Sequence, residues 1–181
     1  MGRLRWAAPI LFALIARADI TCPCDPSKPD TERERQCSLC SLAAKEPAGA
    51  LVFFVQDSNP RKEHRWLALP HDYSPGTFQK LSDLSSTVRL ALWKGAIEKA
   101  KSMFGDQWGV AYNGDHVRTQ CLVHLHIGKL IEGVEFGDFS VVGSPEEIPM
   151  PPEGVGMWVH EVDGKLHVHM GEQVTENVLE R

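Results

Sequence analysis

Short apolar runs of strand length recur along the chain, separated by turn-forming residues. Runs rich in β-forming residues occupy positions 51–55, 65–69, 108–112, 121–127 and 139–142. Runs of this length and composition are typical of strands, and a Ser-Asn-Pro sequence at 58–60 supplies turn chemistry between the first two. The pattern therefore predicts a largely antiparallel sheet that begins with two sequential strands.

One longer stretch has the periodicity of a helix. Its apolar positions, which lie three or four residues apart, are Val88, Leu92, Ala96, Ala100 and Met103. Ser85 or Ser86 can cap the start of this stretch, and Gly105 can end it. We expect these residues to form the one long helix of the fold.

Two dipeptides that end in glycine mark tight turns. The Asn-Gly pair at 113–114 suits a turn with positive φ, and the Asp-Gly pair at 163–164 suits the two-residue turn of a hairpin between 158–162 and 165–169. Together with the helix, these elements predict an α+β fold. It consists of an antiparallel sheet with one long helix, plus a C-terminal β-hairpin.

The N-terminus has the composition of a signal peptide. Arg3 and Arg5 precede an apolar stretch over 6–15, and Ala-Arg-Ala at 16–18 is a small-x-small cleavage pattern. An apolar stretch of about ten residues is too short to cross a bilayer, and its alternative reading is a buried N-terminal helix. We therefore expect an exported protein, periplasmic or secreted, with no membrane span. The expected units are a signal peptide (1–18), a Cys-rich N-terminal segment (19–50), a core (51–143) and a Pro-rich loop with the C-terminal hairpin (144–181).

The balance of charge limits the kinds of partner. The formal net charge of the 181-residue chain is −5, and removal of residues 1–18 takes away three arginines and no acid, which leaves −8. Nucleic-acid phosphates require clustered cations, and the chain has no long run of Lys and Arg. This balance argues against a nucleic-acid partner but allows a small phosphorylated substrate, for which a few local cations suffice.

Four of the five cysteines crowd the region after the signal peptide. Cys22, Cys24, Cys37 and Cys40 can form two disulfides in any of three pairings, or they can hold a tetrahedral zinc ion. Export favours disulfides. Cys121 stands alone in the predicted strand over 121–127.

That strand carries two histidines on one face. Side chains alternate across a strand, so Leu122, His124 and His126 share one face while the residues between them share the core face. The two imidazoles then lie about 7 Å apart and point the same way. A His-x-His sequence is also a plain solvent-facing strand pattern, so its neighbours decide its meaning.

The neighbouring residues suit an anionic group. The predicted turn before the strand contains Asn113, Gly114, Arg118 and Gln120, which offer a cation, amides and glycine-loop N–H groups to a phosphate. Imidazole is largely unprotonated at neutral pH and is a competent nucleophile. These residue types predict a phosphate-handling site around the histidines.

The order of these features resembles the histidine-triad (HIT-like) superfamily. Strand, helix, strand, Asn-Gly turn and a Gln-x-x-x-His-x-His strand follow one another, and Ala-Leu-Pro at 68–70 is similar to the strand-ending apolar-x-Pro ahead of the family's helix. The resemblance covers roughly residues 37–131. Within the superfamily, Arg-Thr-Gln at 118–120 is most similar to bacterial CDP-diacylglycerol pyrophosphatases.

The resemblance implies an exported phosphoanhydride or phosphodiester hydrolase, or a nucleotidyl transferase, that acts through a phospho-histidine intermediate. It implies His124 as the nucleophile and His126 as the residue that assists at the phosphate and leaving group. The further implied roles are catalytic for Gln120 and substrate-binding for Asn113, Gly114 and Arg118.

The resemblance also carries expectations about partners and cofactors. The substrate is a small phosphorylated molecule, a nucleotide or a CDP-lipid, and a homodimer is allowed. The reaction requires no cofactor. Cys37 and Cys40 resemble the zinc pair of some superfamily members, so zinc is a possible ligand there.

Leu122 departs from the family's pattern because it takes the place of the first histidine. An alternative register makes His124 the first histidine and His126 the nucleophile, with Gly128 in the third place. The spacing from Gln120 favours the first register. The departure keeps open a second hypothesis, a catalytically weakened HIT-like protein that binds a nucleotide, a phospholipid or a metal.

The C-terminal hairpin contains a second group of histidines. With 163–164 as its turn, His160 faces His167 and Trp158 faces His169, so three imidazoles share one face. Such a set can take a transition metal or extend a phosphate site, and a polar exposed face explains it equally well.

Overall fold

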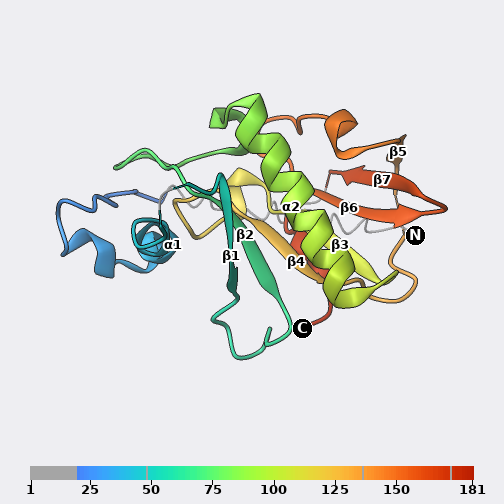
Figure 1. Cartoon of the computed structure of the whole chain (residues 1–181), viewed down its shortest axis with the longest axis horizontal. Coiled ribbons are helices and arrows are strands. Elements are labelled where there is room, and N and C mark those ends of the chain that lie inside the picture. The colour runs from blue at the N-terminus through green and yellow to red at the C-terminus, as the bar shows by residue number, and fades with distance from the viewer. Residues whose placement is uncertain (1–19, 48, 136, 172) are drawn as a thin grey trace, which may run out of the picture.

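The computed structural model describes residues 20–47, 49–135, 137–171 and 173–181, so the expected signal peptide at 1–18 lies outside the described residues. Within them, every strand pairing is antiparallel, and the sheet has the order β1-β2-β4-β3-β6-β7-β5 (Figure 1). The strands are β1 (Val52–Gln56), β2 (Trp66–Pro70), β3 (Trp108–Tyr112), β4 (Leu125–Lys129), β5 (Phe139–Val142), β6 (Met157–Val162) and β7 (Lys165–Met170). The predicted α+β class is confirmed.

Helix α2 (Ser86–Phe104) covers one face of the sheet (Figure 1). The Ser85 hydroxyl accepts a hydrogen bond from the Val88 N–H, and Gly105 ends the helix with a φ of 58°. The helix buries an apolar stripe against the sheet, made up of Leu92, Trp93, Ala96, Ile97 and Ala100. Apolar periodicity and capping residues therefore predicted this helix correctly.

The C-terminal hairpin has the predicted register and belongs to the main sheet. His160 pairs with His167 and Trp158 with His169. The turn residues Asp163 and Gly164 have φ values of 50° and 73°, as a two-residue turn between twisted strands requires. The hairpin continues the sheet because β6 pairs with β3 and β7 pairs with β5.

The strand expected over 121–127 begins later, at Leu125. The Cys121 N–H donates to the Gln36 carbonyl, and the Cys121 carbonyl accepts from the Gln79 N–H. These backbone groups bond to loops rather than to a neighbouring strand, so residues 121–124 lie outside the sheet ladder. The strict alternation of faces therefore does not extend back to Leu122.

The expected positive-φ turn at Asn113-Gly114 is wrong. Gly114 has a φ of −56°, and Asn113 is not among the residues with positive φ. A Cβ at position 114 would lie 2.3 Å from the Gly154 carbonyl oxygen. Glycine is needed here because another segment of backbone passes very close, not because the turn is left-handed.

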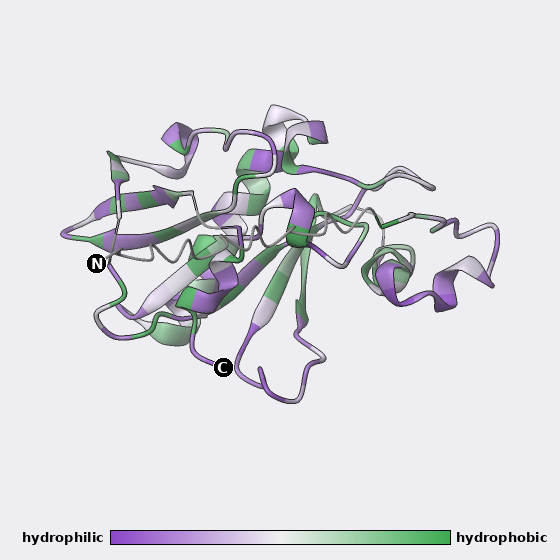
Figure 2. Cartoon of the chain, turned by 180° about the vertical axis from the view of Figure 1, so that it is seen from behind, coloured by the Kyte–Doolittle hydropathy of each residue, from purple (hydrophilic) through white to green (hydrophobic). Residues whose placement is uncertain are grey.

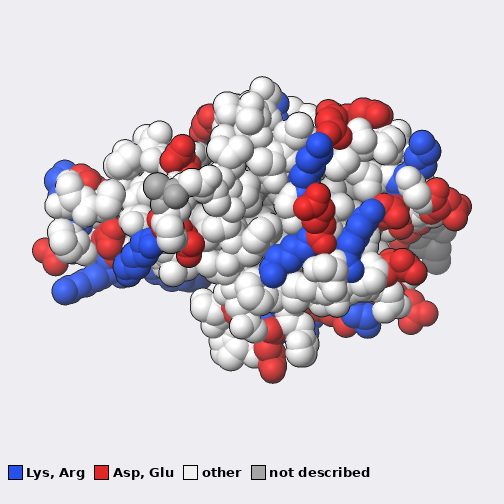
Figure 3. Space-filling view, viewed as in Figure 1, with Lys and Arg blue, Asp and Glu red and all other residues white. Residues whose placement is uncertain are grey.

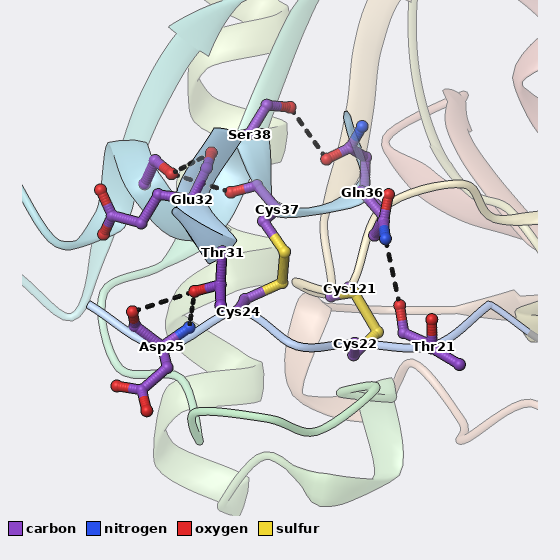
Figure 4. The surroundings of a disulfide bond; sticks show 12 residues. Thr21, Cys22, Cys24, Asp25, Thr31, Glu32, Gln36, Cys37, Ser38 and Cys121 are labelled. Atoms are coloured by element: carbon purple, nitrogen blue, oxygen red, sulfur yellow. Dashed lines mark hydrogen bonds between the residues drawn. A yellow bond between two sulfur atoms is a disulfide. The ribbon is translucent and has the colours of Figure 1, made fainter. Parts of the chain in front are cut away.

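One disulfide closes a loop inside the N-terminal segment, and a second ties that segment to the loop before β4 (Figure 4). They join Cys24 to Cys37 and Cys22 to Cys121. The expectation that Cys121 stands alone is wrong, and the remaining thiol, Cys40, is buried at the short helix α1 (Ser38–Ala43). Sequence could not show this pairing because it depends on which loop the segment packs against.

The C-terminal residues pack on the face of the sheet opposite α2. Leu179 forms an isolated bridge with Leu130, and the Arg65 side chain donates to the carbonyls of Leu179 and Glu180. Hydrophobic residues concentrate in the strands, and the loops at the margins are mostly hydrophilic (Figure 2). Within the described residues, no helix has the length and apolar character that crossing a membrane requires.

Candidate functional site

The start of β4 separates an apolar face from a polar pocket. Val123, Leu125 and Ile127 are buried beneath α2, whereas His124 and His126 line a pocket of about 360 Å³. The N-terminal segment, the β1–β2 loop, the loop before β4 and the C-terminal residues contribute its other walls. This volume lies in the range of small-molecule sites.

Hydrogen bonding fixes the proton of His124 on one ring nitrogen. Its Nδ1 lies 2.9 Å from the Leu122 carbonyl oxygen, which can only accept, so Nδ1 carries the hydrogen. Nε2 has no hydrogen-bond partner among the described residues. Burial, aided by the nearby charge of Arg118, lowers the pKa of His124 to about 4. The ring is therefore uncharged at neutral pH and has one available lone pair.

His126 has a hydrogen bond at one ring nitrogen and a carboxylate nearby, without a hydrogen bond, at the other. Its Nε2 accepts from the Asn113 side-chain amide at 3.2 Å, and its Nδ1 lies 3.5 Å from a Glu176 carboxylate oxygen. Burial, followed by the neighbouring His124, lowers the pKa of His126 well below its ordinary value. The rings of His124 and His126 meet edge to face with centroids 4.9 Å apart. His126 therefore packs and orients His124, and Asn113 orients His126.

Glu176 is the charged centre of the pocket wall. Its carboxylate accepts from Lys62 and, at 2.8 Å, from Arg65. Burial raises the pKa of Glu176, but His126, Lys62 and Arg65 outweigh that effect and hold the pKa at about 2. Sequence reasoning missed Lys62, Arg65 and Glu176 because only the fold brings the β1–β2 loop against the C-terminal residues.

Arg118 lines the pocket, but its guanidinium bonds inside the protein. It donates to the carbonyls of Gln79, at 2.6 Å, and Leu122, at 3.4 Å, and it pairs with Asp115 at 3.2 Å. Its side chain is fully buried. The substrate-binding role expected for Arg118 does not fit this arrangement, because a buried arginine with these partners holds the loop together instead.

Gln120 and Gly114, which were also expected in the site, make contacts within the protein. The Gln120 amide donates to the Arg35 carbonyl and its side-chain oxygen accepts from Ser38, so Gln120 connects the pocket loop to the N-terminal segment. Gly114 accommodates the close backbone approach of Gly154. Phosphate binding requires donors that are not already bonded within the protein. The contacts of Gln120 and Gly114 are therefore structural rather than directed at a ligand.

Leu122 does not face the pocket. Its side chain is fully buried in a cluster with the disulfide sulfurs and with Phe53, Leu67 and Leu69. Only its carbonyl reaches the site, where it accepts from His124 and Arg118. Leucine is therefore required here by apolar packing, and it neither opens nor blocks the pocket.

The cysteines do not provide a zinc site. The sulfurs of Cys24, Cys37 and Cys121 lie within 4.8 Å of one another, but each is bonded in a disulfide and none is a thiolate. Cys37 is therefore not the zinc ligand that the sequence suggested. Burial raises the pKa of the remaining Cys40 thiol to about 11, which keeps it protonated.

Charges on the face that carries α2 are mixed. Basic and acidic side chains alternate there and no continuous basic patch is visible (Figure 3). Ion pairs from α2, such as Lys94 with Glu146 in the loop after β5 and Lys101 with Glu161 on β6, account for part of this mixture. This face lacks the clustered cations that a nucleic-acid backbone requires.

Comparison with known proteins finds partial likeness to methyltransferases. The chain is similar to the "Ribosomal RNA small subunit methyltransferase C" of Salmonella newport (strain SL254) and to the protein of the same name in Salmonella choleraesuis (strain SC-B67). Each is 29% identical over 118 residues, which is 62% of this chain and 32% of the relative. The chain thus spans about a third of the length of these curated relatives. No family model and no solved structure matches it.

This likeness contradicts the function predicted from sequence. The predicted activity, a phosphoanhydride or phosphodiester hydrolase or a nucleotidyl transferase that works through a phospho-histidine, is wrong, since the matched relatives are named methyltransferases. The site agrees, because Arg118, Asn113 and Gln120 use their donors internally. The resemblance to the histidine-triad superfamily stays a prediction. What remains is a polar pocket in which His124 Nε2 has no hydrogen-bond partner among the described residues.

Proposed function

We propose that the protein binds a small polar ligand in this pocket and that His124 accepts a proton from it. The observation that carries the proposal is the hydrogen bond of 2.9 Å from His124 Nδ1 to the Leu122 carbonyl. It places the ring proton on Nδ1 and leaves the Nε2 lone pair for the ligand. An uncharged imidazole with one free nitrogen is the form that acts as a general base.

The charges of the pocket favour a ligand with little net charge. Lys62 and Arg65 are already paired with Glu176, and Lys62 also lies 3.9 Å from Asp57. Arg35, Lys62 and Arg118 line the pocket together with Asp57 and Glu176, so an anion would meet two carboxylates as well as three cations. Lys62 and Arg118 are already paired with carboxylates. Ser58 and Asn59 add groups that both donate and accept hydrogen bonds.

The low pKa of His124 determines at which stage of a reaction the ligand can transfer its proton to Nε2. A base with a pKa of about 4 holds a proton poorly at neutral pH, so it does not ionise an alcohol or amine in advance. Proton transfer to Nε2 is favourable only while the ligand O–H or N–H is forming a new bond and becoming acidic. The reaction class that fits is group transfer to such an acceptor.

Methyl transfer is a second candidate within this class, favoured by the names of the two relatives. The acceptor oxygen or nitrogen forms a bond to the methyl carbon, and the bond between that carbon and a sulfonium sulfur breaks. The products are the methylated acceptor, a neutral thioether and a proton. The proton goes to His124 Nε2.

The accessibility and charge of His124 can be tested with diethyl pyrocarbonate, which modifies unprotonated imidazole nitrogen. At about pH 5.5, one unit below the ordinary histidine pKa, His124 is expected to be modified. His71 is an internal contrast, because its hydrogen bonds to the Glu46 carbonyl and Asp72 raise its pKa and leave it protonated. Peptide mass mapping measures both residues in one sample.

Ligand binding is tested with the same reagent. A library of uncharged polar fragments is screened for compounds that protect His124 while the exposed His64 stays reactive. Protection of His124 alone supports the proposal. A His124 that does not react at about pH 5.5, or a full library without a protecting fragment, overturns it.

The methyl-transfer candidate requires binding of S-adenosylmethionine, the common biological methyl donor. Calorimetric titration of the full chain is expected to show binding that is retained in His64→Gln, the exposed control. A titration without heat at millimolar donor excludes methyl transfer and leaves the proton-acceptor proposal to the fragment screen.

We also propose that the protein works in the periplasm or outside the cell. Two disulfides in so short a chain are typical of oxidising compartments. Protein recovered from such a compartment and then denatured is expected to contain one free thiol per chain, from Cys40. Five thiols per chain would contradict this location.

A further inference from the structure

Three histidines and one glutamate converge on the far end of the sheet from the His124 pocket. His160 on β6 and His167 and His169 on β7 share one face of the hairpin, as their register requires. Glu135, in the loop that leads to β5, reaches over this face and accepts from His167 Nδ1 at 2.5 Å. None of these residues lines the His124 pocket.

The spacing of the donor atoms suits a single ion. One ligand atom from each of the four residues lies within 4.8 Å of all the others. A tetrahedral zinc site with bonds of about 2.0–2.1 Å places its ligand atoms about 3.3 Å apart. The Glu135 and His167 atoms lie 2.5 Å apart and the Glu135 and His160 atoms 3.8 Å apart. These separations fall on either side of the tetrahedral value, so small side-chain rotations suffice to place the four atoms around one ion.

His160 is a buried histidine whose ligand atom is unsatisfied. Its side chain is 7% exposed, and Nε2 is buried without a hydrogen-bond partner among the described residues. That atom points toward Glu135, whose carboxylate oxygen lies 3.8 Å away.

Aromatic neighbours hold two of the rings in place. Trp158 stacks on His169 with centroids 3.8 Å apart and planes 8° from parallel. Phe139 stacks on His167 with centroids 4.4 Å apart. Supporting contacts of this kind orient metal ligands and reduce the entropy lost when an ion binds.

We propose that Glu135, His160, His167 and His169 bind one divalent transition-metal ion of the zinc class. Three imidazoles and a carboxylate suit zinc and its neighbours rather than magnesium or calcium, which take oxygen ligands. Four protein ligands make a closed site. The ion therefore fastens the loop that carries Glu135 onto the hairpin.

The test is zinc binding to the full chain after dialysis against a chelator. Calorimetry is expected to give one zinc ion per chain, and Co²⁺ in its place is expected to give the visible absorption of a tetrahedral nitrogen and oxygen site. His160→Asn and His167→Asn are each expected to weaken binding more than about 100-fold, beyond the cost of losing a supporting residue. His64→Asn, at an exposed position, is the matched control and retains wild-type affinity.

A second measurement needs no variant. Bound zinc is expected to protect His160 and His167 of the wild-type chain from diethyl pyrocarbonate while His64 remains reactive. Absence of zinc binding at micromolar concentration overturns the proposal. Binding that survives both hairpin substitutions but is lost in His124→Asn also overturns it, because the ion would then occupy the other pocket.

Discussion

Loss of the Cys22–Cys121 disulfide is expected to lower the free energy of unfolding more than loss of the Cys24–Cys37 disulfide. The two bonds span sequence separations of 99 and 13 residues. Closing such loops in the unfolded chain corresponds to about 4.7 and about 2.9 kcal/mol at 25 °C in the chain-entropy treatment. The expected difference between the two losses is therefore about 2 kcal/mol.

The assay is urea unfolding of two double variants, Cys22→Ala with Cys121→Ala and Cys24→Ala with Cys37→Ala. Removing both partners leaves no new thiol that can pair with Cys40. Three of the four sulfurs are fully buried and Cys22 is half-buried, so the Cys24 and Cys37 pair loses at least as much packing. A Cys24 and Cys37 variant that is equally or less stable would refute loop length as the deciding effect.

Three further substitutions test the structural roles of site residues. Gly114→Ala is expected to lower the free energy of unfolding by about 1–3 kcal/mol, because its Cβ would lie 2.3 Å from the Gly154 carbonyl oxygen; unchanged urea unfolding would contradict this. Arg118→Met is expected to cost about 3–5 kcal/mol because it removes a buried guanidinium that pairs with Asp115 and donates to two backbone carbonyls; an unaltered melting temperature would mean that the internal bonds are dispensable. The pKa of Glu176 falls from 4.5 to about 2 on folding, so its stabilisation, about 3 kcal/mol, is present above pH 4.5 and is lost as pH falls toward 2. Glu176→Gln is expected to flatten that part of the curve of unfolding free energy against pH, and an equally steep curve would contradict the pairing.

Local patterns predicted the elements well. β3 and β5 have the predicted bounds, α2 has its predicted caps, and the hairpin has its predicted register. Each depends on residues close together in sequence, namely apolar periodicity, a capping serine or a two-residue turn. Sequence reasoning also placed His124 and His126 on one side of the chain, and both line the pocket at the start of β4.

Sequence reasoning missed the features that depend on contacts between residues far apart in the chain. Glu176 and Lys62 meet beside His126 only after the C-terminal residues fold across the sheet, and no local pattern signals that contact. Cys121 looked isolated because its partner, Cys22, lies 99 residues away. The backbone of Cys121 bonds to Gln36 and Gln79 rather than to a neighbouring strand, and Leu122 packs in an apolar cluster away from the pocket.

Residue types alone also overestimated phosphate binding. Asn113 and Arg118 are common phosphate ligands, yet in this fold the first bonds to His126 and Glu176 and the second to Gln79 and Asp115. A buried polar side chain must satisfy its own hydrogen bonds first. A list of suitable residue types therefore predicts where a site lies better than what it binds.

The central claim is that His124 is an uncharged imidazole with its proton on Nδ1 and a free Nε2. Long-range ¹H–¹⁵N correlation spectra of ¹⁵N-histidine-labelled protein measure this directly. The account predicts a protonated Nδ1 and an unprotonated Nε2 at neutral pH, with titration only near pH 4. An Nε2-protonated ring, or titration near the ordinary value of 6.5, would contradict it.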